Sequence, residues 1–463
     1  MSAAIEIYPP EVVENIVQNL PLEDIANVRL CSRSMAALST QETFKSFFLA
    51  KKVNLTRGCL ERFIHITTAS SLACLVEKLT IAGVAVDVEL QKSMVKDKVR
   101  WDTTNNGPIF SSIQTKLTED GVAEAENNLA ALRALKSEQG TMRRDNTAAE
   151  LLARAFQNIR GHRKHGRLLS LTLTVVVFRK DAEQEQQPKE KSDEVAIWQA
   201  AADCFQSTMQ AIGKSHLPVD ELDVFNSTLR CSMALDSVDD LLKSRQSLNE
   251  ILEAVKVLRI SLSERPDDKS EDVDHPRNMR TKDYDAILRL LELFPNLQTL
   301  EMHWYNARSY RLAELASGRP DLLEYCTKQE VNLKSLNTLV LRGAAATGQS
   351  LLRFLQSVPA KSVSLAEFHI IDERFTSILE YCTSDEAGLE HVSFDDMWEP
   401  SLVYFDGMKS KFPVLGGSRG GQTLERRGPE VRKPIQYHFA QRPLGSPAAY
   451  RWHTIKQAEY GPP

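Results

Sequence analysis

The sequence predicts an α/β chain in which a short helical unit precedes a long array of strand–helix repeats. Two observations lead to this prediction. Residues 1–50 carry apolar residues at helical spacing, and an apolar-x-x-apolar-x-apolar pattern recurs eight times between residues 76 and 394. The length of 463 residues allows about three domain-sized units, or one small module joined to a repeat array.

Composition and charge narrow the class of protein. The 57 basic and 62 acidic residues give a net charge of −5, which argues against a general nucleic-acid binder. No apolar run approaches the roughly 18–20 residues of a membrane span, and residues 1–7 lack the pattern of a secretory signal. The seven cysteines form no C-x-x-C pair, so neither a disulfide scaffold nor a zinc module is expected. We expect a soluble intracellular protein, cytoplasmic or nuclear.

Residues 1–50 are predicted to form three short helices. Proline suits the first turn of a helix, so Pro9 and Pro10 mark the start of the first helix, and Pro21 marks its end. A unit of about 50 residues buries only a marginal core. We therefore expect an apolar face to remain for a partner. The apolar residues of the first helix are Val12, Val13, Ile16, Val17 and Leu20.

The repeated pattern predicts a ladder of strands. Each copy ends with alternate apolar residues, as in a short strand with one buried face, and helical stretches at 284–294, 348–358 and 375–382 separate the later copies. This alternation is typical of a leucine-rich solenoid, and several unrelated αβ units are the alternative. The copies begin at Val76, Leu168, Val219, Val255, Leu297, Leu336, Leu365 and Leu389.

Some segments interrupt the ladder. Residues 179–194 and 264–282 are charged and of low complexity, so we expect mobile loops there. The end of the chain is rich in Gly, Pro and Arg, which predicts a basic tail that is disordered, or mostly extended and lying back on the last repeats. The predicted division is a helical unit at 1–50, a linker helix and first repeat at 51–83, a helical insertion at 84–165, the solenoid at 166–400 and the tail at 401–463.

Motifs of catalysis are not found. The sequence has no G-x-x-x-x-G-K-[ST] phosphate loop, H-E-x-x-H helix, G-x-S-x-G elbow or kinase signature. We therefore predict no catalytic residue, cofactor or metal ion, and favour a binding protein. The basic run from Arg160 to Arg167 could meet phosphate, but a solvated turn between a helix and a strand is the simpler interpretation.

The concave wall of a solenoid offers a binding surface for a protein partner. Side chains between the buried ladder positions point outward there, and they mix charged, aromatic and apolar groups, as specific protein interfaces do. Alternation would bury Trp304 and expose its two neighbours. The candidate substrate-binding residues are Phe225, Arg259, His303, Tyr305, Arg342, His369 and Asp395.

Residues 8–48 (YPPEVVENIVQNLPLEDIANVRLCSRSMAALSTQETFKSFF) resemble the F-box family. That family has two leucine–proline steps around an amphipathic helix, then aspartate with an aliphatic residue, and later an arginine–aliphatic–cysteine–arginine segment. Tyr8 replaces the first leucine, and Met35 replaces a tryptophan, both with large apolar side chains. The matching residues are Pro9, Glu11, Ile16, Leu20, Pro21, Asp24, Ile25, Arg29, Leu30, Cys31 and Arg33.

The resemblance implies a partner and a role. F-box proteins dock on the Skp-type adaptor of a cullin–RING ubiquitin ligase and present a substrate to it, while other subunits perform the chemistry. The segments FFLAKKVNL and SLACLVEKLTIAG also look like F-box proteins of filamentous fungi. The alternative is a repeat scaffold for protein assembly without a role in ubiquitination. By position, the adaptor contacts implied are Pro9, Ile16, Leu20, Pro21, Leu22 and Ile25.

Overall fold

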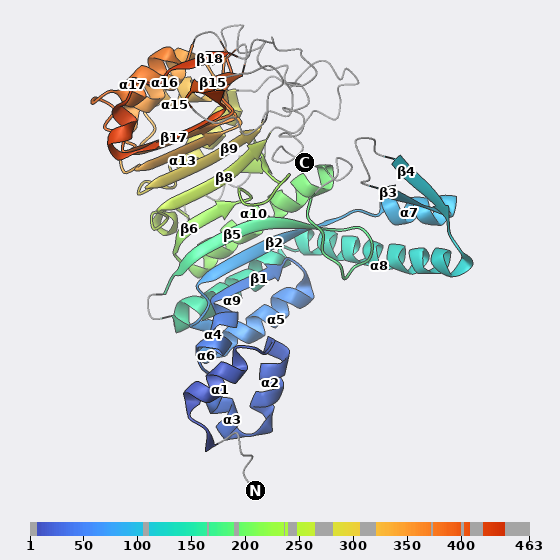
Figure 1. The fold of residues 1–463 in the computed structure, drawn as a ribbon. Coiled ribbons are helices and arrows are strands. Elements are labelled where there is room, and N and C mark those ends of the chain that lie inside the picture. The colour runs from blue at the N-terminus through green and yellow to red at the C-terminus, as the bar shows by residue number, and fades with distance from the viewer. Residues whose placement is uncertain are drawn as a thin grey trace.

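The structure is a computed structural model that describes most of the chain. Figure 1 shows an elongated molecule with a helical unit at one end, a twisted sheet in the middle and a set of short strands at the other end. The described residues are 7–104, 111–163, 166–188, 194–235, 237–238, 248–263, 281–305, 321–371, 374–399, 402–407 and 420–439.

The N-terminal unit contains four helices. The three predicted helices are present, and a fourth helix contains the aromatic residues Phe44, Phe47 and Phe48. The four helices enclose a small core of their own, formed by Val13, Val17, Ile25, Met35, Phe44 and Phe48. Their bounds are α1 (Pro10–Val17), α2 (Leu22–Cys31), α3 (Arg33–Leu38) and α4 (Glu42–Leu49).

One 11-stranded sheet runs through the rest of the molecule, and its strand order follows the chain. All neighbouring strands are parallel except the last pair, so the predicted α/β class with a parallel ladder is confirmed. The leucine-rich solenoid stays a prediction. The strands are β1 (Ala50–Asn54), β2 (Lys78–Val86), β5 (Leu168–Phe178), β6 (Val219–Val224), β7 (Met233–Ala234, paired only with β8), β8 (Val257–Ser263), β9 (Thr299–Tyr305), β10 (Thr338–Arg342), β12 (Ser362–Ala366), β14 (His391–Asp395) and β17 (Thr423–Arg427).

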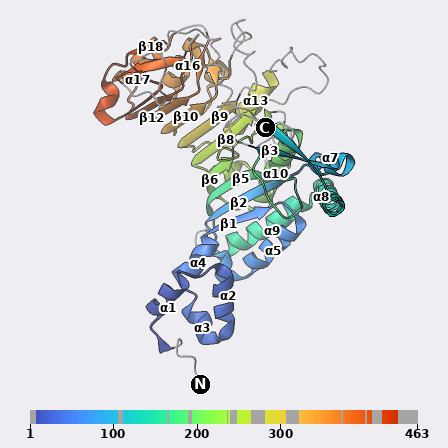
Figure 2. The same cartoon turned by 45° about the vertical axis from the view of Figure 1, so that its right-hand side comes forward.

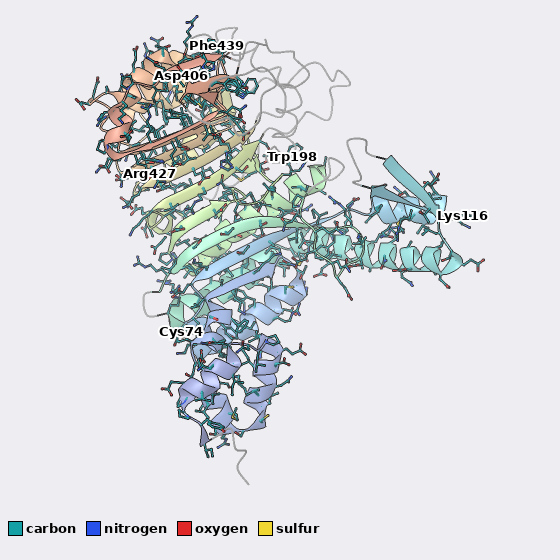
Figure 3. The ribbon with its side chains drawn as sticks, in the orientation of Figure 1. Cys74, Lys116, Trp198, Asp406, Arg427 and Phe439 are labelled. Atoms are coloured by element: carbon teal, nitrogen blue, oxygen red, sulfur yellow. The ribbon has the colours of Figure 1, made fainter. Side chains whose placement is uncertain are left out.

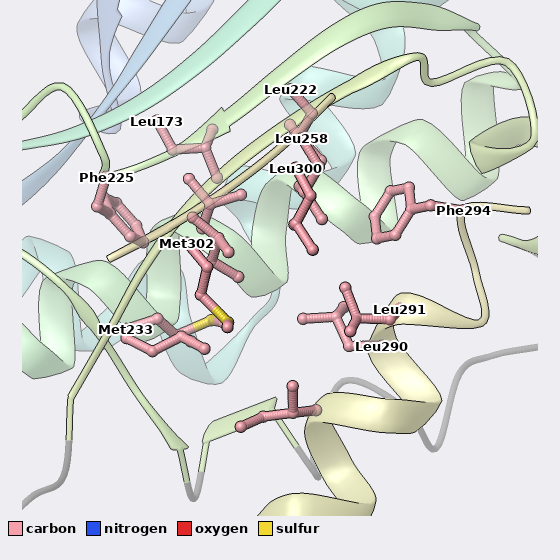
Figure 4. Close-up of a cluster of buried hydrophobic side chains, with 14 of the residues drawn as sticks. Leu173, Leu222, Phe225, Met233, Leu258, Leu290, Leu291, Phe294, Leu300 and Met302 are labelled. Atoms are coloured by element: carbon pink, nitrogen blue, oxygen red, sulfur yellow. The ribbon is translucent and has the colours of Figure 1, made fainter. Parts of the chain in front are cut away.

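Helices cover one face of this sheet. The ladder leucines of successive strands, such as Leu222, Leu258 and Leu300, point into this layer and meet Leu291 and Phe294 (Figure 4). These contacts form one continuous core along the sheet. The helices are α5 (Arg57–Thr68), α6 (Ser70–Ala73), α9 (Thr147–His162), α10 (Glu194–Ser215), α12 (Asn249–Leu252), α13 (Thr281–Leu291), α15 (Leu322–Lys328), α16 (Gly348–Ser357) and α17 (Thr376–Thr383).

An arm projects from the carboxyl end of β2. It consists of α7 (Glu89–Asp97), the hairpin of β3 (Val99–Thr104) and β4 (Ser111–Lys116), and α8 (Glu119–Arg144). In Figures 1 and 2 it stands clear of the sheet over most of its length. The predicted helical insertion at 84–165 is therefore corrected. Residues 84–86 complete β2, and α9 belongs to the helical layer because Ala155, Phe156 and Ile159 are fully buried in the core.

The first charged loop is tied to the sheet as far as the structure describes it. Glu185 accepts hydrogen bonds from Lys52 and from Asn54, the latter at 2.6 Å, and Gln186 pairs with Val177. The prediction of a mobile loop at 179–194 is wrong for residues 179–188, because Glu185 and Gln186 bind β1 and β5. In the second loop, residues 264–280 lie outside the described part of the chain.

The tail is ordered where the structure describes it, so disorder is wrong for residues 402–407 and 420–439, and the other expectation, an extended segment lying on the last repeats, agrees with them. Leu424 and Val431 are buried against the last repeats. This packing anchors the segment and lets β17 cover the last parallel strand in the antiparallel direction. The other elements are β15 (Val403–Asp406), β16 (Gly420–Gly421), η4 (Gly428–Arg432) and β18 (Tyr437–Phe439).

One repeat is out of register with the sequence interpretation. The copy assigned to Leu365 begins instead at Ala360, so the strand of that repeat is β12. The segment predicted to be the strand forms the short β13 (His369–Ile370), which pairs with β11 (Ala345–Ala346) in a separate sheet. The first strand, β1, was not predicted, because Val53 is its only buried residue.

Candidate docking and recognition surfaces

The helical unit is fixed by local caps and one internal core. Ser32 caps α3 by accepting a hydrogen bond from the backbone N–H of Met35 at 3.0 Å. Met35 then points into the core with 4% of its surface exposed. Methionine therefore fills the position where the family has tryptophan, and its flexible apolar side chain suits such a site.

Polar side chains join α1 to the N-terminal end of α4. The Glu14 carboxylate accepts hydrogen bonds from the backbone N–H and the hydroxyl of Thr43, at 2.8 and 2.5 Å. The Gln41 amide donates to the carbonyl of Pro10 at 2.7 Å. These long-range bonds hold α1 in place, so the direction of its outer face is fixed.

The outer face of α1 is apolar and open. Tyr8, Val12 and Ile16 are 51%, 38% and 42% exposed. Val12 and Ile16 are four residues apart and so lie on one side of the helix, and Tyr8 precedes its first turn. Of the predicted adaptor contacts, Pro9 and Pro21 are also exposed, whereas Leu20 and Leu22 are partly buried against the core. Of these residues, Ile16 lies on the outer surface of α1 and Pro9 precedes this helix, whereas Pro21 and Leu22 are at the start of α2.

Ile25 does not lie on that surface. It is fully buried in the core of the helical unit, between the helices. The expectation that Ile25 contacts the adaptor is therefore wrong. On α2 the aliphatic residue that follows the aspartate points inward, which spacing alone did not reveal.

Comparison with known proteins agrees with this geometry. The F-box domain family matches residues 9–47, which are the four helices and their connections. No curated protein matches the chain. The chain thus contains an F-box domain, formed by α1 to α4. An F-box domain indicates docking on the Skp-type adaptor of an SCF-type ubiquitin ligase.

The F-box joins the sheet through a packed junction. Leu49, the last residue of α4, leads directly into β1, and its carbonyl accepts a hydrogen bond from the backbone N–H of Glu77 at 2.9 Å. Ile66, Leu72 and Leu75, from α5, α6 and the segment after α6, pack against the F-box core. Cys74 marks this junction in Figure 3. The F-box and the sheet are therefore held together by side-chain contacts as well as by the chain.

The sheet face opposite the helical layer is polar from β6 onward. At its start this face is covered, because Leu132 and Leu135 of α8 pack on Val84 and Val176. The loop around Glu185 lies against β1 beside this cover. From β6 to β17 the outward side chains are hydroxyl, aliphatic and charged groups. We call this part the polar face.

A network of charges lies at the β6 end of the polar face. Arg259 faces Glu221 at 3.3 Å and Glu301 at 3.5 Å, and the other oxygen of Glu301 lies 3.0 Å from His303 Nε2. Burial alone would raise the pKa of Glu301. Hydrogen bonds from His303 and Asn226 and the charge of Arg259 outweigh this effect and lower the pKa to about 2. Burial is also the main cause that lowers the pKa of His303.

The predicted substrate-binding residues do not all face outward. Phe225 is fully buried in the core, because the chain turns at this residue with a φ of 63°. His303 lies on the polar face but is 6% exposed, so the expectation of an open side chain is wrong. His369 is in β13 and stacks on Trp398, away from the main sheet. The side chain of Tyr305 lies outside the described part of the molecule.

The other three candidates are on the polar face. Arg259 is 35% exposed, and Arg342 is paired in register with His303. Asp395 lies two strands beyond β10 and accepts a hydrogen bond from Thr423. The structure therefore brings Arg259, His303 and Arg342 together across three neighbouring strands and leaves Asp395 apart.

Sequence reasoning missed a second polar cluster at the far end. The Ser362 hydroxyl lies 2.8 Å from Nδ1 of His391, whose Nε2 lies 3.3 Å from Glu425. Arg427 donates to Glu425 at 2.7 Å. Glu425 and Arg427 are on β17, in the segment interpreted as a disordered tail. A hydrogen-bonded pair of residues such as Ser362 and His391 only becomes visible once the strand register is known.

This cluster places a hydroxyl, an imidazole and a carboxylate in series. A hydroxyl beside an imidazole and a carboxylate is the order of a nucleophile relay, which also needs N–H donors for an oxyanion. The N–H groups of Lys361 and Ser362 both donate to the carbonyl of Asn337 within the sheet. Within the described residues, no group of three His, Cys, Asp or Glu side chains could hold a metal ion, and no helix is long and apolar enough to cross a membrane.

Proposed function

We propose that this protein is a substrate receptor of an SCF-type ubiquitin ligase, which docks through its F-box and binds a protein substrate on the polar face. The observation that supports this proposal best is the exposed apolar stripe of Tyr8, Val12 and Ile16 within the matched F-box domain. Pro9, Ile16, Leu20, Pro21 and Leu22 are the proposed contacts with the adaptor. The chain itself contributes proximity, because it holds a substrate near the ubiquitin carrier.

The adaptor contact is tested by Ile16→Asp. A carboxylate placed in the centre of an apolar interface is costly to desolvate, so affinity for a purified Skp-type adaptor should fall at least about 100-fold. Binding is measured by isothermal titration calorimetry with the full chain. Because Ile16 is exposed, the variant should keep the melting temperature of the wild type.

Val195→Asp is the matched control. Val195 is an aliphatic residue of α10 that is more exposed than Ile16 and lies outside the F-box. This variant should bind the adaptor as the wild type does. Equal affinities of Ile16→Asp and wild type would refute the proposed contact. The half-lives of the interacting proteins are then compared in cells that carry only Ile16→Asp. If none of them lengthens, the result favours a scaffold over a substrate receptor.

A further inference from the structure

The middle of the polar face has a floor of small, uncharged side chains. Strand pairing places the outward residues of β9, β10, β12 and β14 side by side in three rows. Between Glu301 and His391, no side chain in the first two rows is larger than valine, and Arg342 lies in the third row. Successive strands lie about 4.8 Å apart, so four strands give a floor roughly 15 Å long. All of the floor side chains are partly exposed. They are Thr299, Thr338, Val340, Ser362, Ser364 and Ser393.

The floor ends in acidic groups on one side. Glu221 and Glu301 both lie against the single guanidinium of Arg259, so two carboxylates share one cation. Glu221 is 45% exposed. A ligand with an ammonium or guanidinium group at this position would balance the excess negative charge.

Arginine and histidine close the floor on the other side. Arg427 is 77% exposed, although it donates to Glu425, and its planar group still has N–H donors that suit a carboxylate. His391 lies beside it, between Ser362 and Glu425. This end therefore complements an acidic group, in contrast to the end at Glu221.

We propose that the polar face binds an extended peptide segment of a partner protein, laid across the strands, with a basic residue over Glu221 and Glu301, small uncharged residues over the floor and an acidic residue at Arg427. The inference rests on the proposed function, since it specifies the substrate segment. From β6 to β17 the face spans six strand spacings, about 29 Å, which an extended chain covers in about nine residues. Hydroxyls along the floor can bond to the peptide backbone.

A random twelve-residue peptide library displayed on phage tests the proposal with the full chain as the target. Enriched sequences should carry Lys or Arg near one end and Asp or Glu near the other, about eight positions apart. Ser364→Trp places an indole on the floor and should weaken a selected peptide at least tenfold. Glu221→Lys should weaken it as well, and a peptide with its basic residue changed to Glu should recover part of that loss.

Controls separate this inference from the proposed function. Val195→Asp should keep full peptide affinity, and Thr338→Arg serves as a second floor variant if Ser364→Trp melts early. The inference would be overturned if the enriched peptides lacked a basic residue near one end and an acidic residue near the other. It would also be overturned if the floor variants bound these peptides as tightly as the wild type does. The absence of any enrichment would overturn it as well. Adaptor affinity is measured on the same preparations, and its loss in Ile16→Asp together with unchanged peptide binding shows that the two sites fail independently.

Discussion

At the scale of single residues, Glu301 links the charges of the polar face to stability. Its pKa is lowered from 4.5 to about 2 in the folded state. A carboxylate with a lowered pKa contributes stability that is complete above its unfolded pKa and is lost as the pH falls through its folded pKa. The window for this group is therefore from pH 4.5 down to about pH 2. His303 acts in the same direction, because its lowered pKa also disfavours the protonated folded state.

Glu301→Gln should flatten the acid side of the stability profile. The free energy of unfolding is measured by urea titration at about pH 6 and about pH 3.5. Between these two pH values, the free energy of unfolding should fall by about 1 kcal/mol more in the wild type than in the variant. This difference follows from the linkage relation and the change in the pKa of Glu301. Glu61→Gln removes a carboxylate from the exposed side of α5 and should follow the wild type. Parallel profiles for Glu301→Gln and wild type would contradict the role of Glu301.

At the scale of elements, the close approach of α10 to β2 depends on Gly83. A Cβ atom at this position would lie 2.5 Å from the carbonyl oxygen of Ala200 and 3.0 Å from the Cβ of Cys204. Because the nearest atom belongs to the helix backbone, the whole helix would have to move away. This one residue sets the spacing between the helical layer and the sheet where α10 crosses β2.

Gly83→Ala should therefore destabilise the protein by about 1–3 kcal/mol, the usual range for an overpacked core. Thermal unfolding followed by circular dichroism measures the change. Gly140→Ala is the matched control, because its added methyl group meets no atom within 4 Å, and alanine favours the helix by about 0.5–1 kcal/mol. A melting temperature of Gly83→Ala at or above that of the wild type would show that α10 adjusts without cost.

The sequence predicts elements well where apolar residues recur with a clear period. The helices near 284–294, 348–358 and 375–382 and seven of the eight ladder strands appear where expected. The failures have physical causes. Leu365 fits two registers because Val363 and Phe368 flank it, and Ile25 is apolar whether it faces the core or a partner. Glu425 and Arg427 reach the polar face only through long-range pairing, which local patterns do not contain.

At the scale of the whole molecule, α5 connects the two hydrophobic cores. Leu60 and Phe63 on this helix belong to the core under the sheet, whereas Ile66, one turn further, packs against the F-box. Leu72 and Leu75 add to the same contact. The direction of the F-box relative to the polar face is therefore set by packing and not by a free linker.

Changing Leu72 and Leu75 together to Ser should loosen this connection without unfolding either core. Small-angle X-ray scattering should then show a larger radius of gyration and a broader distance distribution than in the wild type. Adaptor affinity should stay the same, because Ile16 and its neighbours are untouched. Val195→Asp is again the control, and identical scattering curves for the double variant and the wild type would show that the backbone alone fixes the junction.

The reversed direction of β17 has a consequence for growth of the array. A further parallel strand–helix unit would need a parallel neighbour, and β17 offers an antiparallel edge that carries Glu425, Arg426 and Arg427. Such a charged edge also discourages pairing with the strands of other molecules. β17 therefore ends the parallel ladder, and the distance from the F-box to the last strand of the sheet is fixed by the fold.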